Sequence, residues 1–364
     1  MKIVVLAGGL SPERNVSLSS GVMVSEALRS RGHRAALVDL YFGLENWEGT
    51  PEEVYDAPAP EKWRRVDHAA PDLAEVKAKR KWKSESQFGP GVLELCAGAD
   101  AVFLALHGAC GEDGRVQAAL DLMGIPYTGS GHLGSAVAMD KDLTKRLCVQ
   151  AGIATPQWRL LEYTEADIPA LCESLTLPLV VKPMDSGSSI GVSIAHDRET
   201  LAAAMVTLSR YRGRDVFLDP FCGSGTLVIV EQYVSGREIQ VGVLEEKALP
   251  SIEIIPKQGF YDYENKYQPG AAVEVCPAPV DAGLEALLEE TAQKVHALVG
   301  LAVYSRSDFI VDAQGKPWFL EINTLPGMTP TSLVPQEAAA VGIGYGALCQ
   351  TIVEASLKAR KGGA

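Results

Sequence analysis

The sequence predicts a mixed α/β fold with two or three domains. An apolar strand at 2–7, an apolar-periodic helix at 16–31 and a strand at 35–40 give a β-α-β order, which is typical of a parallel sheet. Two short apolar runs at 307–311 and 317–323 flank a segment with turn composition, which predicts a β-hairpin. With 364 residues, 47% of them hydrophobic, the chain is long enough to bury several cores.

The charge and cysteine content narrow the class of protein. A formal net charge of −13 disfavours nucleic acid or an anionic membrane as the main partner. No run approaches ~18 apolar residues, and the first residues carry neither a long apolar core nor an A-x-A cleavage site. The seven cysteines are odd in number and form no C-x-x-C pair, which suits a reducing compartment. We therefore expect a cytoplasmic protein without a nucleic-acid or membrane partner.

Polar residues follow the first predicted strands, where ligands bind in open α/β sheets. Ser11, Glu13 and Arg14 come just after the first strand and could contact a substrate, although an ordinary surface loop is the alternative. His107 comes after a buried strand at 101–106 and opens a glycine-rich turn. Its side chain could be a ligand, a base or a turn residue with its hydrogen bonds satisfied.

Two segments break the periodic pattern. Residues 45–90 are rich in proline and charge and are expected to form an insertion, with a solvated basic face at 77–83. The segment at 129–134 matches G-x-G-x-x-G, but no acidic residue follows about 20 positions later, as a nicotinamide-binding turn requires. We therefore do not assign a dinucleotide site there.

A glycine- and serine-rich loop at 183–191 lies between two predicted strands, the first of which ends at Lys182. Such a loop can close over a triphosphate as a lid. Further on, strands at 227–231 and 238–244 form an edge that can offer backbone hydrogen bonds to an adenine and an acid to a ribose. These features together favour nucleotide binding.

One motif supports a different class of enzyme. The string Asp-Pro-Phe-Cys-Gly-Ser-Gly-Thr at 219–226 resembles the S-adenosylmethionine motif of amino-directed DNA methyltransferases. It precedes a strand rather than a helix, and the catalytic Asp/Asn-Pro-Pro-Tyr partner is absent from the sequence. A methyltransferase is therefore kept as the alternative from another class.

The remaining segments are a loop and two helices. The stretch 259–267 is polar and rich in aromatic residues, so we expect a mobile loop that carries Lys266 and Tyr267. Apolar residues at helical spacing predict scaffold helices at 284–299 and 336–358.

The predicted hairpin carries two acids on one face. We take Asp312 to pair with Pro317, and this register sets Asp308 directly opposite Glu321. Two facing carboxylates repel each other unless a cation lies between them, and a small set of oxygen ligands suits Mg²⁺ shared with phosphates. A solvated acidic face is the alternative.

The neighbours of these acids favour the metal site. Side-chain alternation places Asn323 on the face of the acids and directs Leu320 and Ile322 into a core. Arg306 precedes the first acid by two residues, and an irregular Asn-Thr-Leu-Pro-Gly loop follows the hairpin and can turn backbone N–H groups toward an anion. The stretch therefore predicts a site for phosphate or an acyl phosphate.

Taken in order, the motifs match those of a known family. They are Gly-Gly with Ser-Pro-Glu-Arg, His-Gly-x-x-Gly-Glu-Asp-Gly, Tyr-Thr-Gly-Ser-Gly, Met-Asp-Lys, Val-Lys-Pro with Gly-Ser-Ser-x-Gly, the Lys-Tyr of the loop, and Arg-x-Asp through Glu-x-Asn-Thr-x-Pro-Gly-Met-Thr. The chain thus resembles the D-alanine–D-alanine ligases of the ATP-grasp superfamily. The resemblance implies a three-domain ATP-grasp fold whose N-terminal domain holds a parallel sheet, with domains at 1–135, 136–230 and 231–364.

The resemblance also implies roles for residues at matching positions. The residues expected at ATP are Lys141 and Lys182 at the phosphates, Ser188 and Ser189 in the lid, and Glu231, Gln232, Val234 and Glu238 at the adenine and ribose. Those expected to hold two Mg²⁺ ions, for which Mn²⁺ may substitute, are Asp308, Glu321 and Asn323. Many relatives carry lysine where Gln232 stands, so this adenine contact departs from the family pattern.

The amino-acid substrates have their own expected residues. These are Glu13 at the ammonium of the first D-alanine, Arg306 and the Gly327 amide at the oxyanion, Ser332 and Leu333 at the carboxylate of the second D-alanine, His107 and Lys266 nearby, and Tyr267 in a network with Glu13 and Ser188. The implied reaction makes a D-alanyl phosphate, which the second D-alanine converts to D-alanyl-D-alanine for peptidoglycan synthesis. A homodimer is expected, and a D-alanine–D-lactate ligase is the alternative within the superfamily.

Overall fold

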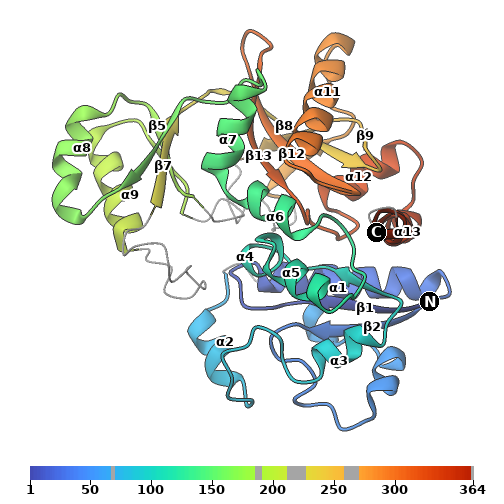
Figure 1. Ribbon diagram of the computed structural model, residues 1–364. Coiled ribbons are helices and arrows are strands. Elements are labelled where there is room, and N and C mark those ends of the chain that lie inside the picture. The colour runs from blue at the N-terminus through green and yellow to red at the C-terminus, as the bar shows by residue number, and fades with distance from the viewer. Residues whose placement is uncertain (67–69, 185–190, 211–226, 258–269, 362–364) are drawn as a thin grey trace.

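The structure is a computed structural model that describes residues 1–66, 70–184, 191–210, 227–257 and 270–361. Three β-sheets organise these residues, and Figure 1 shows the first sheet below, the second at the left and the third above the first. The mixed α/β class is confirmed. The domain bounds at 1–135, 136–230 and 231–364 stay a prediction.

The first sheet is parallel, as its β-α-β pattern predicts. Its strands are β1 (Lys2–Ala7), β2 (Arg34–Asp39) and β3 (Ala101–Leu104), in the order β2-β1-β3. Helix α1 (Arg14–Ser30) joins the first two strands and packs on them. Gly21 allows this close packing, because a Cβ there would lie 2.5 Å from the Cβ of Ala7. The shorter helices around this sheet are α3 (Val92–Ala97), α4 (Ala109–Glu112), α5 (Arg115–Leu122) and α6 (His132–Met139).

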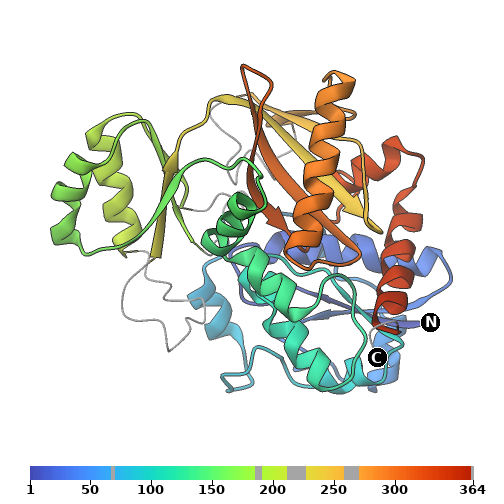
Figure 2. The ribbon, with the colours of Figure 1, turned by 45° about the horizontal axis from the view of Figure 1, so that its top comes forward.

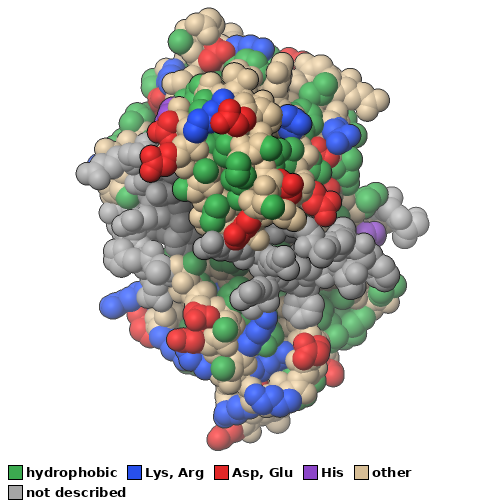
Figure 3. Space-filling model, turned by 90° about the vertical axis from the view of Figure 1, so that its left-hand side faces the viewer, with side chains coloured by type: hydrophobic (Ala, Val, Ile, Leu, Met, Phe, Trp, Pro, Cys, Tyr) green, Lys and Arg blue, Asp and Glu red, His purple; other side chains and the backbone are tan. Residues whose placement is uncertain are grey.

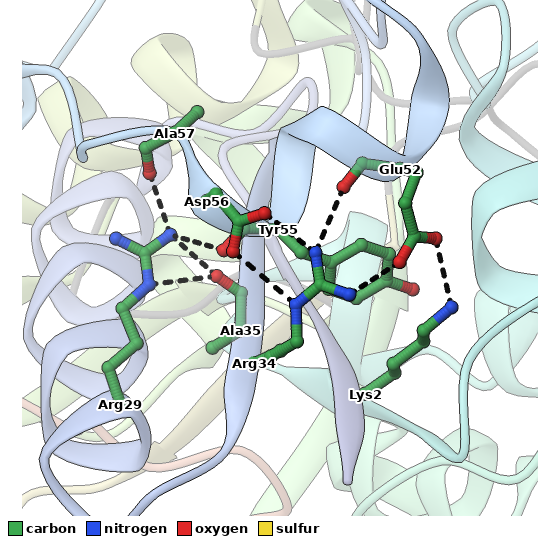
Figure 4. A network of polar contacts seen from close by, with 8 residues as sticks. All are labelled: Lys2, Arg29, Arg34, Ala35, Glu52, Tyr55, Asp56 and Ala57. Carbon is green, nitrogen blue, oxygen red and sulfur yellow. Dashed lines mark hydrogen bonds and ion pairs between the residues drawn. The ribbon is translucent and has the colours of Figure 1, made fainter.

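Part of the predicted insertion is fixed to the first sheet. The insertion contains η1 (Pro51–Asp56), η2 (Glu61–Arg64) and α2 (Leu73–Lys79). Figure 4 shows how Arg34 reaches two acids of η1, with 2.5 Å to Glu52 and 2.7 Å to Asp56. Each of these ion pairs is half exposed and contributes little to stability. Burial of the Tyr55 ring therefore contributes most of the free energy that holds η1 against the first sheet.

The basic run at 77–83 is not uniformly solvated, contrary to the sequence-based expectation. Arg80 is only 3% exposed, and its guanidinium lies over the ring of Tyr41 at 4.1 Å. It also donates hydrogen bonds to the backbone oxygens of Ser84 and Ser86. Arg80 therefore links the segment at the end of the insertion to Tyr41, because a guanidinium can bind carbonyl oxygens and an aromatic face at the same time.

The second sheet is antiparallel and carries the chain on both sides of the predicted lid. Its strands are β4 (Trp158–Glu162), β5 (Leu179–Pro183), β6 (Ser193–Ala195) and β7 (Leu227–Gln232), in the order β4-β7-β5-β6. Helices α8 (Ile168–Ser174) and α9 (Arg198–Arg210) cover its outer face, preceded by η3 (Glu165–Asp167). Helix α7 (Lys141–Gln150) leads into the sheet, and the Asp140 carboxylate caps it by accepting from the Leu143 amide at 2.9 Å.

The third sheet contains the predicted hairpin. Its strands are β8 (Gly236–Leu244), β9 (Lys247–Ala248), β10 (Ile252–Pro256), β11 (Ala272–Val275), β12 (Tyr304–Asp312) and β13 (Pro317–Asn323). They follow the order β11-β10-β8-β12-β13, with β9 paired to β8. Helix α11 (Ala282–Leu298) packs lengthwise on one face of this sheet, as Figure 2 shows.

The hairpin has the predicted facing acids but a different register near its turn. Val311, rather than Asp312, pairs with Pro317, and a β-bulge before Phe309 restores the pairing of Asp308 with Glu321. The bulge leaves Leu320 without a partner on β12. The expectation that Leu320 points into a core is therefore wrong.

The bulge also changes which side chains are buried. Phe319 is fully buried in the core beneath the sheet, as is Ile322 at 4% exposure, whereas Leu320 lines a cavity with Glu321. In a regular strand Phe319 and Glu321 would face the same side. The extra residue lets the phenylalanine enter the core while the glutamate faces the cavity.

The predicted single helix at 336–358 is also wrong. The tail forms α12 (Leu333–Ala340) and α13 (Tyr345–Lys361), with Gly342 between them at φ +82°. Helix α13 then packs on α1, far away in the sequence (Figure 2). Within the described part of the chain no single helix is long and apolar enough to cross a membrane, and α12 and α13 pass that test only as a pair bent by 102°.

The surface carries mixed charge. Figure 3 shows acidic and basic side chains interspersed on the face that it draws. The formal net charge of the chain is −13.

Candidate active site

A cavity of about 430 Å³ lies between the second and third sheets. Apolar side chains from both sheets form its walls, including Val180, Ile194, Ile254 and Ile310. Its lining contains eight predicted residues: Lys141, Lys182, Glu231, Gln232, Val234, Glu238, Asp308 and Glu321. Apolar walls together with charged side chains suit a flat aromatic base joined to an anionic tail.

Two lysines neutralise the buried carboxylate of Glu231. The Nζ of Lys182 lies 2.6 Å from one carboxylate oxygen, and the Nζ of Lys145 lies 2.9 Å from the other. Burial by itself would raise the pKa of Glu231, but the charges of the two lysines hold the pKa below its usual value. The side chain of Glu231 is therefore bound to these lysines, rather than directed at a ribose or an adenine.

Lys145 was missed by the sequence analysis, although a signal for it exists. It lies four residues after Lys141 in α7, and this spacing puts both ammonium groups on one side of the helix. Lys145 is fully buried and also donates to the Thr155 hydroxyl at 2.7 Å. A fully buried lysine needs such partners, because burying an unpaired ammonium group is costly.

The two hairpin acids are held by different cations. Arg306 forms a two-pronged pair with Asp308, with 2.8 Å from Nε to Oδ1 and 3.0 Å from Nη2 to Oδ2. The Nζ of Lys141 lies 3.3 Å from Glu321. Asn323 donates to Asp308 at 3.4 Å, so the amide lies on the face of the acids as predicted.

These residues fit a magnesium site that phosphates complete. Among the residues that the structure describes, no three His, Cys, Asp or Glu side chains are grouped as a metal site. The hairpin thus offers two carboxylates and one amide, which suits Mg²⁺ because this ion keeps several ligands from water or phosphate. Basic side chains now balance the two carboxylates, as a metal ion would do.

A second cavity, of about 650 Å³, lies between the carboxyl end of the first sheet and the loop after the hairpin. Its lining unites six predicted substrate residues: Glu13, His107, Arg306, Gly327, Ser332 and Leu333. A space of about 20 Å³ lined by Glu112, Lys141, Glu321 and Asn323 lies where the two cavities approach each other. The predicted nucleotide and substrate residues therefore meet at the acidic end of the hairpin.

His107 is a satisfied residue of the wall rather than a proton acceptor. Its Nδ1 lies 2.9 Å from the backbone oxygen of Leu325, and its Nε2 lies 3.1 Å from the hydroxyl of Ser20. Burial lowers the pKa of His107, which favours the neutral ring. In this form Nδ1 donates to the carbonyl and Nε2 accepts from the hydroxyl, so both nitrogens are used.

Glu112 is a further cavity residue that the sequence analysis did not single out. Its carboxylate accepts from the amides of Gly108 at 2.9 Å and Leu325 at 3.1 Å. Burial, reinforced by the charge of Glu13, raises the pKa of Glu112 to about 8. The only sequence signal was its place in the His-Gly-x-x-Gly-Glu-Asp-Gly motif.

Glu13 and Glu112 approach the same turn. Gly108 has φ +73°, and a Cβ there would lie 2.7 Å from a carboxylate oxygen of Glu13. Only glycine satisfies both the backbone conformation and the close approach. The turn therefore brings two acids to one wall of the second cavity.

The loop after the hairpin is held in shape by hydroxyl groups. The Ser332 hydroxyl accepts from the Thr329 amide at 3.1 Å and lies 2.8 Å from the Thr329 hydroxyl. Ser332 occupies the N-cap position of α12, but its side chain does not cap the helix. The N-terminus of α12 thus begins at the cavity, where an anion is stabilised by the first backbone N–H groups.

Four predicted site residues cannot be placed. Ser188, Ser189, Lys266 and Tyr267 lie outside the described residues, and so does the motif at 219–226.

Comparisons with known proteins give one result. A family model described as the D-ala D-ala ligase N-terminus matches residues 2–130, and one for the C-terminus matches residues 147–354. A D-alanine--D-alanine ligase of Pediococcus pentosaceus is 40% identical over 355 residues, which cover 97% of each chain. One of Lacticaseibacillus casei is 38% identical over 359 residues, covering 98% of this chain and 96% of the relative.

Solved structures show the same likeness. A D-alanine--D-alanine ligase from Bacillus anthracis, complexed with ATP, aligns with a TM-score of 0.72 at 30% identity and covers 100% of this chain and 99% of its own. The VanG D-Ala:D-Ser ligase from Enterococcus faecalis aligns with a TM-score of 0.71 at 27% identity, covering 98% and 99%.

Proposed function

The chain belongs to the D-alanine–D-alanine ligase family, and from this premise we propose that its two cavities form one active site, which joins two D-alanine molecules with ATP. The observation that carries the proposal is the meeting of the nucleotide and substrate residues at the Asp308–Glu321 pair. The product is D-alanyl-D-alanine, with ADP and phosphate released. Because the relatives match 97% of the chain, the methyltransferase alternative is not retained.

ATP fits the cavity between the second and third sheets. The adenine would lie between the apolar walls, with the strand edge from Glu231 to Val234 offering backbone hydrogen bonds and Glu238 facing the ribose. The Gln232 side chain would supply a neutral contact in place of the lysine of many relatives. Lys141 and Lys182 would then neutralise the phosphates, with Ser188 and Ser189 assigned to the lid by the resemblance alone.

Asp308, Glu321 and Asn323 are the proposed ligands of two magnesium ions. When bound, the metal neutralises charge on the transferred phosphoryl group and so lowers the barrier to attack. Asp308 would keep Arg306 in place at the same time, because each carboxylate oxygen has two lone pairs. Manganese should substitute, since it also prefers oxygen ligands.

The second cavity holds the amino acids. Glu13 would bind the ammonium group of the first D-alanine. The carboxylate of this D-alanine would then attack the γ-phosphate. Arg306 and the Gly327 amide would stabilise the oxyanion formed when the second amine attacks the acyl phosphate. Ser332 and Leu333, at the N-terminus of α12, would bind the carboxylate of the second D-alanine.

Glu112 is the proposed acceptor of the proton lost by the second amine. It lines the substrate cavity, and its pKa of about 8 lies close to neutral pH, which is suitable for a general base. His107 would position Leu325 and Ser20 instead, since both of its ring nitrogens are bonded. Lys266 and Tyr267 keep the roles implied by the resemblance, at the second substrate and in the network with Glu13 and Ser188.

A cytoplasmic homodimer completes the proposal, and sedimentation analysis of the purified chain tests its oligomeric state. The nucleotide site is tested by Lys182→Ala. This change deletes a cation aimed at the phosphates and should remove most ADP release. An ADP release rate equal to that of the parent protein would mean that the cavity between the sheets is not the nucleotide site.

A further inference from the structure

Glu337 is a fully buried acid on α12, directly after the loop that carries Gly327 and Ser332. Within residues 1–66, 70–184, 191–210, 227–257 and 270–361, neither carboxyl oxygen has a hydrogen bond of normal geometry. Burying a carboxyl group without a good partner costs free energy, so such positions are rare in native proteins. A leucine or methionine would fill the space at lower cost, so we expect the acid to have a role that an apolar side chain cannot serve.

A glycine in the third sheet lets Glu337 reach the sheet surface. A Cβ on Gly242 would lie 2.3 Å from Oε2 of Glu337, so any side chain there would displace the carboxyl group. Gly242 in β8 is the cross-strand partner of Arg306 in β12. Since facing residues project to the same side of a sheet, the carboxyl group covers the position beside Arg306.

The next residue on this face of β8 is also buried and polar. Gln240 is fully buried, and its cross-strand partner is Asp308. Neither its amide oxygen nor its amide nitrogen has a hydrogen-bond partner in the described parts of the chain. Glu337 and Gln240 therefore lie beside the Arg306–Asp308 ion pair, with Glu337 next to Arg306 and Gln240 next to Asp308.

We propose that Glu337 is a positioning residue that holds Arg306 in its catalytic orientation. The proposal rests on the role of Arg306 at the oxyanion proposed above. Both Asp308 oxygens hold Arg306, and the proposed metal draws on the same carboxylate. Asp308 would thus be shared between the guanidinium and the metal, so a second acid beside Arg306 would help to keep the guanidinium in place. Glu337 lies beside Arg306 on this face of the sheet, at the position that a side chain of its cross-strand partner Gly242 would take.

The charge state of Glu337 agrees with this role. Burial raises the pKa of Glu337 well above its usual value, and Asp308 and Glu285 act in the same direction. The charge of Arg306 and the Gly242 amide oppose the rise. A carboxyl group at this position can accept a hydrogen bond from Arg306, and in its protonated form it can also donate one to the amide oxygen of Gln240. A neutral group can thus orient the guanidinium without cancelling the charge that the oxyanion needs.

Four variants of the full chain test the proposal. Glu337→Met removes the polar group at similar size, Gly242→Ala displaces the carboxyl group, and Glu337→Gln keeps the shape and the hydrogen bonding. Val334→Ala is the matched control, because it opens a space beside the same helix, in the apolar core that includes the first sheet, without removing a polar group.

The variants should separate by kcat. Glu337→Met and Gly242→Ala should each lower kcat by roughly tenfold to a hundredfold, with the KM for ATP nearly unchanged, since a misplaced catalytic group costs rate. Glu337→Gln should recover kcat to within about threefold of the parent, because the neutral hydrogen bonds persist. Val334→Ala should lower the melting temperature and leave kcat unaltered.

Other outcomes decide against the proposal. Parent-like kcat in folded Glu337→Met, or in Gly242→Ala if the first variant does not fold, would overturn it. An equal loss of kcat in Val334→Ala would reduce Glu337 to a packing residue. Arg306→Met separates the two levels: if it stays active, the proposed role of Arg306 fails as well. If it is inactive while Glu337→Met and Gly242→Ala keep their kcat, only the role of Glu337 fails.

Discussion

Asp308 and Glu321 face each other across the β12–β13 hairpin, yet the two cations that hold them come from different parts of the chain. Arg306 binds Asp308 from the same strand, whereas Lys141 reaches Glu321 from the start of α7. The acids thus lie where the cavity between the second and third sheets approaches the second cavity. Both cations are proposed to act on the transferred phosphoryl group or on its acyl product.

Glu321→Gln should abolish ligation with little loss of stability. The change removes a proposed metal-ligating carboxylate while it keeps the size of the side chain and the strand pairing. ADP release in saturating Mg²⁺ and the melting temperature should be measured together, with the exposed Glu290→Gln on α11 as a control. Near-normal turnover would exclude Glu321 as a metal ligand.

Lys145→Met should reduce the free energy of unfolding by about 3 kcal/mol, because it leaves the buried Glu231 with one cation instead of two. ATP binding should also weaken, because Lys182 alone would then neutralise Glu231 and would be less available to the phosphates. Urea denaturation measures the first effect and ATP titration the second.

The control for Lys145→Met is Lys79→Met, whose ion pair with Glu75 is largely exposed and should matter little. Equal stability of the two variants would show that the buried cluster is not stabilising.

The pH dependence of ligation should follow Glu112. Its raised pKa means that the carboxylate is protonated, and inactive as a base, below about pH 8. The ratio kcat/KM for the second D-alanine should therefore rise with pH and level off above about 8. The sign for stability is opposite: ionising this buried acid costs more than ionising it in the unfolded chain, so its contribution falls between pH 4.5 and 8.

Glu112→Gln should remove the rising limb of the pH profile and most of the activity. A variant that keeps the parent profile would assign the proton transfer to another group.

Tyr267→Phe should allow some ligation of D-lactate while D-alanyl-D-alanine synthesis weakens rather than vanishes. The resemblance places this tyrosine in a network with Glu13 and Ser188, and one buried hydroxyl contributes on the order of 1–3 kcal/mol. Product chromatography with both acceptors present measures the ratio. An unmutated enzyme that makes mostly depsipeptide at pH 7 would identify the D-lactate alternative as correct.

The sequence alone predicted which side chains of the hairpin face each other better than it predicted the details of the strand pairing. The facing acids, Asn323 and Arg306 were placed correctly because strand alternation is a local rule. The bulge at Leu320 was not predictable, since it depends on Phe319 finding space in the core under the sheet. Such packing between distant segments leaves no periodic signal in the sequence.

Buried charges were missed for a similar reason. Lys145, Glu112 and Glu337 look like ordinary helix residues, and only tertiary contacts show that they are buried. The break in the tail helix had a local signal in Gly342, but the apolar spacing continues past it and suggested one helix. The bend between α12 and α13 goes with the packing of α13 on α1, which is far away in the sequence.

The central claim is that the joined cavities form a D-alanine–D-alanine ligase, and stereoselective ADP release tests it most directly. With purified protein, ATP and Mg²⁺, D-alanine should stimulate ADP release and yield one D-alanyl-D-alanine per ADP. L-alanine should leave the rate at background. Equal stimulation by both enantiomers, or ADP release without dipeptide, would contradict the account.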